Sequence, residues 1–220
     1  IGLCLLSTVL APLSCGTPKE SIVVDGLSGP RGLAMSESGT VLIAEAGGGR
    51  ILELVDGHRT HELAKGLPHT LDSGPGGNYP AGPSAVVELE NKLYVVVGEF
   101  KGERFGRLYR VDPDGTHEAI TGPTGINFES AGRFSNPYDL IEAPEINGWI
   151  VADAGRNALL AVSRNGTTRD YALFPKLNVQ GVETKVEVVP TGIDRGPDGA
   201  VYVGSFTGFP YPEGEAIVWR

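Results

Sequence analysis

Several residue types that mark common enzymes and scaffolds are scarce in this chain of 220 residues. The only two cysteines, Cys4 and Cys15, stand near its start, so the rest has no thiol for a disulfide, a Cys-based metal site or a redox motif. The four histidines fall mostly in predicted turns, and we interpret them as solvated turn residues rather than as bases of a Ser-His-Asp triad. The net charge of −9, without a cluster of Lys or Arg, argues against a nucleic-acid partner.

Helical patterns are missing as well. No window shows a sustained 3.6-residue period with caps, so we expect almost no helix beyond the first dozen residues. The chain instead has 32 glycines and 16 prolines, distributed among β-branched runs. This composition is typical of an all-β fold rich in turns.

The chain repeats itself after four prolines, Pro30, Pro83, Pro137 and Pro190, which stand 53, 54 and 53 residues apart. Each proline is followed by a short strand-like run, a polar turn, a β-branched run and a third strand. The β-branched runs are 41–43, 95–97, 149–151 and 201–203, and the third strands are 51–54, 108–111, 159–162 and 217–219. A further turn follows in the first three repeats, and we expect that of the third, at 165–166, to be a type I′ hairpin turn.

Units of about 40 to 50 residues built from short strands indicate the blades of a β-propeller. The sequence predicts an all-β propeller domain over 22–220, with about four blades at 22–67, 68–122, 123–175 and 176–220. Because closed propellers have roughly four to eight blades, and the last repeat stops within its third strand, we interpret the chain as a fragment truncated at its C-terminus. Residues 21–24 are a candidate closing strand, and 68–82 and 123–134 are expected to be loops.

Residues 1–11, within the segment 1–16, form an apolar run that is too short to span a bilayer. We interpret the run as part of a secretory signal, cleaved after Gly16, of a secreted or periplasmic protein without a transmembrane span. The alternative is a lipid anchor on Cys15, although Pro12 stands where a lipobox usually has Leu.

Four strings of the sequence are similar to one family. SNPYDL (135–140), VADAGRNALL (151–160), GPDGAVYVGSFTGFPYPEGEAIVWR (196–220) and GPRGLAMSESGTVLIAEAGGGRI (29–51) resemble the ScyD/ScyE family, relatives of the NHL-type six-bladed propellers. The resemblance covers about 23–220. It implies a six-bladed propeller of which about four blades are present, export from the cytoplasm, and an association with scytonemin biosynthesis or export. Ser205 departs from the Glu expected in the family.

Acidic or hydroxyl side chains follow the second strand of each repeat, namely Glu45, Glu99, Asp153 and Ser205. Three carboxylates and a hydroxyl converging on the propeller axis could hold a divalent cation such as Ca²⁺. The alternative, which we favour, is that each acid caps the amides of the glycine-rich turn after its strand.

Asp139 is the strongest candidate for a functional residue in the central channel. The equivalent residues of the other repeats, Gly32, Ala85 and Gly192, are small, so one blade alone places a carboxylate on the channel. Asp139 could be a ligand or a base there, or a hydrogen-bonding filler. Tyr138, Asp194 and Arg31 are further channel candidates.

Phe206 and Phe209 form an aromatic run that is a candidate patch at the channel mouth, although packing over the blade edge explains it too. Such a patch suits a small apolar or aromatic molecule or a protein partner. We therefore expect an exported binding or scaffold protein. The alternative is a metal-assisted hydrolase or lactonase of the gluconolactonase and strictosidine-synthase-like group.

The metal site of those enzymes does not transfer to this chain. They place an Asn or Asp before the Gly-Leu or Gly-Ile of the innermost strand. The matching residues here are Arg31, Ser84, Tyr138 and Thr191, and none of them is an acid or an amide.

Overall fold

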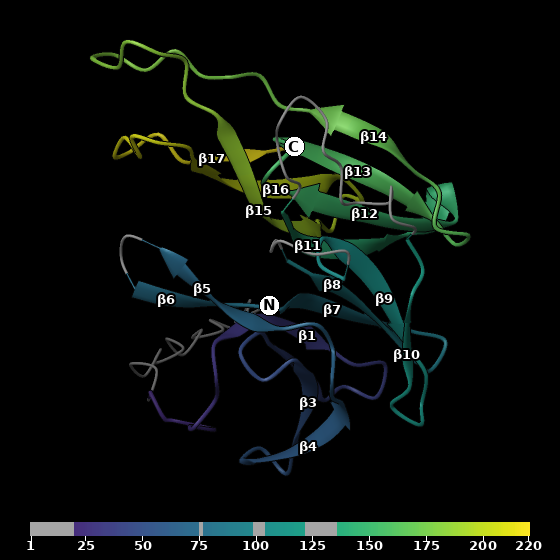
Figure 1. The fold of residues 1–220 in the computed structure, drawn as a ribbon. Helices are drawn as coiled ribbons and strands as arrows, with labels where there is room; N and C mark the ends of the chain where they lie inside the picture. Colours follow the sequence, from purple (N-terminus) through teal and green to yellow (C-terminus); the bar gives the residue numbers. More distant parts are fainter. Residues whose placement is uncertain (1–19, 75–76, 99–103, 122–135) are drawn as a thin grey trace, which may run out of the picture.

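The computed structural model describes residues 20–74, 77–98, 104–121 and 136–220. The described chain forms four antiparallel blade sheets, which fan out around a common centre (Figure 1), and one separate two-stranded hairpin; this confirms the β-propeller arrangement of four blades. None of its helical segments is long and apolar enough to cross a membrane.

Each blade is a meander whose first strand is the innermost. Blade one is β1 (Pro30–Met35), β2 (Val41–Glu45), β3 (Arg50–Val55) and β4 (Arg59–Ala64); blade two is β7 (Pro83–Leu89), β8 (Lys92–Val97), β9 (Arg107–Val111) and β10 (His117–Ala119). Blade three is β11 (Pro137–Ala143), β12 (Gly148–Asp153), β13 (Ala158–Ser163) and β14 (Thr168–Leu173), with the 3₁₀ turn η1 (Pro144–Ile146); blade four is β15 (Val188–Arg195), β16 (Val201–Thr207) and β17 (Ile217–Trp219).

The core lies between the blades, because alternate residues of the middle strands point to opposite neighbours. In β12, Trp149 and Val151 pack toward blade two, whereas Ile150 and Ala152 pack toward blade four. Both faces are therefore buried, which explains why the strand is a continuous apolar run rather than an alternating one. Burial of Ile150 or Val151 stabilises the fold by about 1.5–3 kcal/mol for each side chain.

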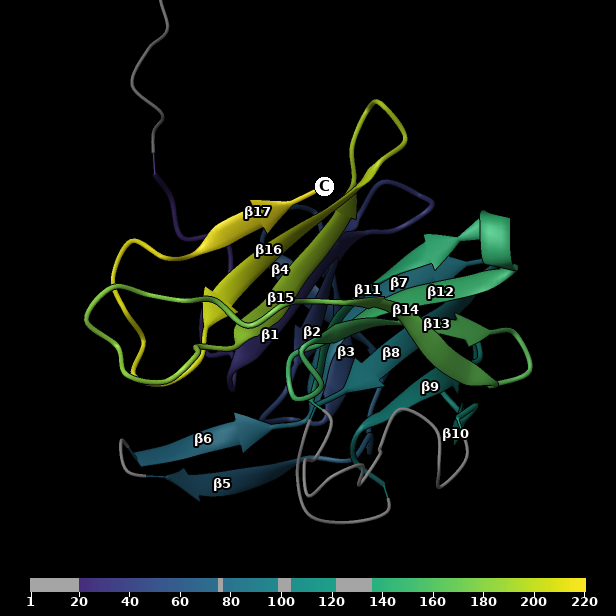
Figure 2. The same ribbon diagram turned by 90° about the horizontal axis from the view of Figure 1, so that it is seen from above.

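Three local predictions are corrected. Residues 21–24 form no strand, and blade one is completed by its own β4. Part of the segment 68–82 is not a loop but the hairpin of β5 (Thr70–Gly74) and β6 (Gly77–Ala81), which projects from the blades (Figure 2). The turn at 165–166 is a type I turn closed by Gly166 N–H donating to Ser163 O at 2.8 Å, because Gly166 has a positive φ and Asn165 does not.

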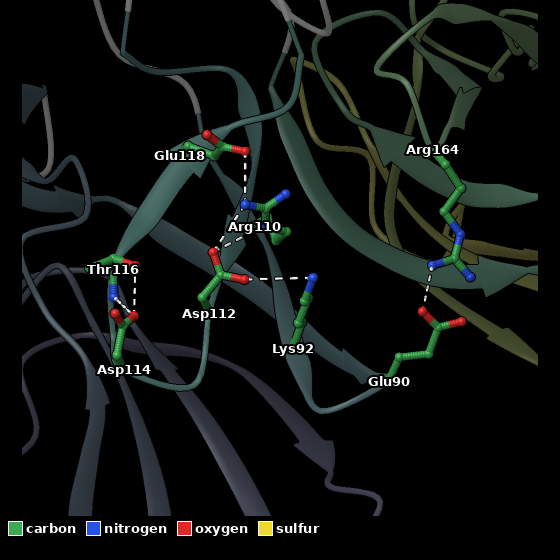
Figure 3. Close-up of polar contacts among 8 residues, drawn as sticks. All are labelled: Glu90, Lys92, Arg110, Asp112, Asp114, Thr116, Glu118 and Arg164. Carbon is green, nitrogen blue, oxygen red and sulfur yellow. Dashed lines mark hydrogen bonds and ion pairs between the residues drawn. The ribbon is translucent and has the colours of Figure 1, made fainter.

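Charged side chains gather on blade two, near the end of the molecule where the innermost strands finish (Figure 3). Asp112 lies 3.0 Å from Arg110 and 3.7 Å from Lys92, and Arg164 of blade three lies 3.8 Å from Glu90 of blade two. Such pairs at a partly exposed surface contribute little to stability. They cover this surface with charge of both signs.

Candidate channel site

A cavity of about 980 Å³ lies against the innermost strands of all four blades. Its wall includes Leu33 of β1, Val86 of β7, Leu140 of β11 and Ile193 of β15, so it is mainly apolar. Asp139 and Asp194 add carboxylates to this wall. The repeat therefore brings one strand of every blade to one cavity, as the sequence predicted.

The strand register places Asp139 where the sequence expected it. Asp139 pairs with Ala152 in the same register as Gly32 with Ala44, Ala85 with Val96, and Gly192 with Gly204. Its Oδ1 accepts a hydrogen bond from Leu140 N–H at 2.9 Å, and its Oδ2 accepts one from Ile193 N–H at 3.0 Å. The carboxylate thus joins the innermost strands of blades three and four.

Burial raises the pKa of Asp139 to about 6, and the nearby negative charge of Asp194 adds to the rise. The two backbone amides oppose it, because they stabilise the ionised form. A carboxyl group with this pKa exchanges its proton near neutral pH, so it could serve as a base or hold a cationic ligand. The carboxylate oxygens that bridge blades three and four are therefore the same atoms that would accept a proton or bind a cation.

A β-bulge recurs at the start of every innermost strand. The register shifts between Pro30 and Gly32, and it shifts at the same place in the other three blades, which leaves an extra residue in each strand. These extra residues are Arg31, Ser84, Tyr138 and Thr191. Bulges re-aim side chains, and sequence reasoning missed them, although the proline before each one marks the position.

Two of the re-aimed side chains meet across blade two. The guanidinium carbon of Arg31 lies 5.6 Å from the centre of the Tyr138 ring, a cation–π contact between blades one and three. Ser84 is buried, and its hydroxyl donates to Pro137 O at 3.0 Å and contacts Val96 O at 3.3 Å. Ser84 therefore has a structural role, whereas Arg31 is exposed.

Glu45 fixes the segment that leads into β1 by hydrogen bonding. Its buried Oε1 accepts the Ser28 N–H at 2.7 Å and an Arg50 N–H at 3.1 Å, while Oε2 forms a close ion pair with Arg50. Burial raises the pKa of Glu45, but these bonds outweigh it and hold the pKa below its usual value. Glu45 thus has a structural role, but its amide partner is Ser28, in the segment ahead of β1, rather than the turn after β2 that the sequence analysis expected.

Asp153 holds the corresponding segment of blade three, with Ala158 opposite it in place of an arginine. Its buried Oδ1 accepts N–H groups of Asn136 at 2.7 Å and Arg156 at 3.2 Å, and among the described residues its Oδ2 has no hydrogen-bond partner. Ala158 stands opposite Asp153 where Arg50 stands opposite Glu45. Burial therefore dominates and raises the pKa of Asp153 to about 7.

Glu99 does not belong to this set. The register pairs Pro83 with Val97, as it pairs Pro30 with Glu45, so the predicted equivalence of Glu99 is wrong by two residues and Glu99 itself lies outside the described residues. Ser205 is the counterpart in blade four, and it donates to Ile217 O at 3.0 Å. Within the described ranges, no three His, Cys, Asp or Glu side chains gather closely enough to hold a cation.

Phe206 and Phe209 lie outside the cavity lining. Their side chains are 57% and 82% exposed, and each ring lies about 6 Å from that of Tyr211, at 6.2 and 6.0 Å respectively. They form an exposed aromatic cluster at the end of β16 and in the turn after it, outside the cavity.

No protein-family model and no curated protein matches the chain. Solved structures do match. A streptogramin B lyase is 18% identical over 91% of this chain and 70% of its own, with a TM-score of 0.47. The PQQ-bound aldose sugar dehydrogenase of Streptomyces coelicolor is 14% identical over 88% of this chain and 66% of its own, with a TM-score of 0.52. A structure of the nidogen/laminin complex also matches, with 12% identity over 86% of this chain and 64% of that one and a TM-score of 0.52. At these identities the likeness shows the propeller fold alone, and the chain spans about two thirds of the length of these proteins.

Proposed function

We propose that the chain is part of an exported β-propeller of the ScyD/ScyE family, which acts as a binding or scaffold module. In this proposal residues 1–16 direct export, and the central cavity receives a small apolar or aromatic molecule. The observation that carries the proposal is the cavity of about 980 Å³ against the innermost strands of all four blades, with mainly apolar walls. Cavities of this size and composition are typical of small-molecule sites.

The alternative, a metal-assisted hydrolase or lactonase, receives no support from a specific observation. Both oxygens of Glu45 contact a backbone amide or Arg50, and Oδ1 of Asp153 accepts hydrogen bonds from two backbone amides. Among the described residues that the sequence analysis named, Asp139 alone combines a place on the cavity wall with a pKa near 6. A rise of several degrees in Tm on adding Ca²⁺, lost in Asp139→Ala, would favour the hydrolase instead.

The cavity proposal is tested with indole, a neutral aromatic probe, in an NMR titration of the chain. Gly192 lines the cavity, and a β-carbon there would have no atom within 4 Å, so Gly192→Leu places an apolar side chain at the cavity wall. Indole is expected to shift signals of the wall and to bind Gly192→Leu at least several-fold more weakly. Gly192→Ala, which adds one methyl group, is the matched control. Absence of saturable binding, or equal binding to Gly192→Leu, would contradict the proposal.

A further inference from the structure

The cavity of about 980 Å³ has two carboxylates on its wall, those of Asp139 and Asp194. Asp139 accepts hydrogen bonds from two backbone amides, and Asp194 Oδ1 accepts one from the backbone N–H of Arg195 at 2.7 Å. Among the described residues, neither carboxylate forms an ion pair with a side chain. Because backbone amides carry no net charge, this part of the wall remains negative.

The charges at this end of the cavity come from residues that the structure describes. On the innermost strands, the wall residues all lie after the bulge, as 33–35 do in β1 and 192–195 in β15. The turns that follow the innermost strands are 36–40, 90–91, 144–147 and 196–200, and all four belong to the described ranges.

The other charged groups of the described wall have partners of their own. Arg195 Nη2 lies 2.8 and 3.1 Å from the two carboxylate oxygens of Glu145. Glu142 lies 3.6 Å from Arg164. Arg195 is the one cation among the described wall residues, and its charge is balanced by Glu145 rather than by the two aspartates.

Asp139 and Asp194 lie close enough to repel one another. Asp139 Oδ2 accepts the N–H of Ile193, the residue directly before Asp194, and the negative charge of Asp194 helps to raise the pKa of Asp139. A bound cation relieves such repulsion. An ionised carboxylate has about four acceptor positions, so the two amides leave acceptor capacity on Asp139.

We propose that the ligand of this cavity carries a protonated amino group, which Asp139 and Asp194 bind while the apolar wall contacts the rest of the molecule. This inference rests on the proposed function, because it concerns the same cavity and narrows its ligands to small organic amines. An ammonium group supplies three N–H donors and one positive charge. It therefore meets the remaining acceptor positions of the aspartates and offsets their charge.

The two aspartates suit an organic cation better than a metal ion. Ca²⁺ takes about six to eight oxygen ligands, whereas among the described residues no three His, Cys, Asp or Glu side chains gather closely enough to hold a metal ion. Leu140 and Ile193, each next in sequence to one of the aspartates, also line the cavity. These apolar side chains favour the hydrocarbon part of an amine.

The experiment is an NMR titration of the chain with three probes that share one ring system and differ in charge. They are 2-naphthylmethylamine, the neutral 2-naphthalenemethanol and the anionic 2-naphthoate. At pH 8, above the pKa of about 6, Asp139 is ionised. The amine is expected to bind about tenfold or more tightly than the alcohol, and the naphthoate more weakly than both, because hydrogen bonds between charged groups are the strong ones.

Two variants assign the preference to the aspartates. Asp139→Asn and Asp194→Asn should each reduce the advantage of the amine over the alcohol several-fold and leave the affinity for the alcohol nearly unchanged. Asp194→Asn guards against loss of folding, because Asp194 is exposed and an amide oxygen can still accept the Arg195 N–H. Asp25→Asn is the matched control: it makes the same change in net charge at an exposed position ahead of β1, outside the cavity lining.

The outcomes separate this inference from the proposed function. Saturable binding of indole and the alcohol without a gain for the amine would overturn the inference and leave the proposed function standing. An advantage of the amine that persists in both aspartate variants would also overturn it. Displacement of the amine by an equal concentration of Ca²⁺ would assign the carboxylates to a metal ion instead. Absence of saturable binding by indole and by all three naphthalene probes would contradict the proposed function and the inference together.

Discussion

At the scale of single residues, Glu45 and Asp153 show how one neighbour sets the charge state of a buried carboxyl group. Both side chains are fully buried, and both accept an amide of the segment that leads into an innermost strand. Arg50 stands opposite Glu45, and the pKa of Glu45 is lowered. Ala158 stands opposite Asp153, so burial raises the pKa of Asp153 to about 7.

Replacing Asp153 by Asn is expected to flatten the pH dependence of stability. The pKa of Asp153 is about 7 in the folded chain against a usual value of 3.8, so ionisation destabilises the fold as the pH rises from about 4 to about 7. An amide stays neutral throughout. Between pH 5 and pH 8, the unfolding free energy should therefore fall by about 1–3 kcal/mol less in Asp153→Asn than in wild type.

Urea unfolding at the two pH values measures this difference. Asp25→Asn, which removes an exposed carboxyl group ahead of β1, matches the change in net charge. Identical pH profiles for Asp153→Asn and wild type would show that burial does not raise the pKa of Asp153.

At the scale of elements, the residue after each bulge decides how the innermost strands approach one another. A β-carbon on Gly32 would lie 2.5 Å from Ser84 O and 2.8 Å from the Ala85 Cα, so β1 and β7 touch through their backbones. At the same position in blade three, Asp139 instead reaches β15 through its carboxylate. One register position therefore serves as a backbone contact in one blade and as a hydrogen-bonded bridge in another.

Gly32→Ala and Gly192→Ala form a matched pair that tests this contact. Gly32→Ala should destabilise the chain by about 1–3 kcal/mol, because the backbone of blade two must move. Gly192→Ala should leave stability within about 0.5 kcal/mol of wild type, since its added methyl group meets no atom within 4 Å. Thermal unfolding of both variants measures the difference, and equal melting temperatures would mean that β1 and β7 separate without cost.

At the scale of the whole molecule, the blades differ in how much of each face the described chain covers. Every residue of β12 is buried, because blades two and four cover its two faces. In β16 and β17, by contrast, Phe206 is 57% exposed and Val218 is 71% exposed. Stability in a repeat architecture comes from interfaces between neighbours, so blade four should open before blade three.

Amide hydrogen exchange under native conditions tests this order. Backbone amides of β12 are expected to exchange at least about tenfold more slowly than hydrogen-bonded amides of β16. The reason is that, within the described chain, opening of blade four breaks one interface between blades, whereas opening of blade three breaks two. Equal protection of the two strands would show that the described blades open as a single cooperative unit.

The sequence by itself determined the repeat, the strand order within each blade and the equivalence of Asp139 with Gly32, Ala85 and Gly192. These follow from local patterns, because strand period and turn residues depend on near neighbours along the chain. Only the tertiary structure decided that Val97 rather than Glu99 is the counterpart of Glu45. It also showed that Ala158, not an arginine, stands opposite Asp153, and that Arg31 contacts the Tyr138 ring across blade two. A bulge and the stacking of separate sheets set these relations, and both depend on contacts between residues far apart in sequence.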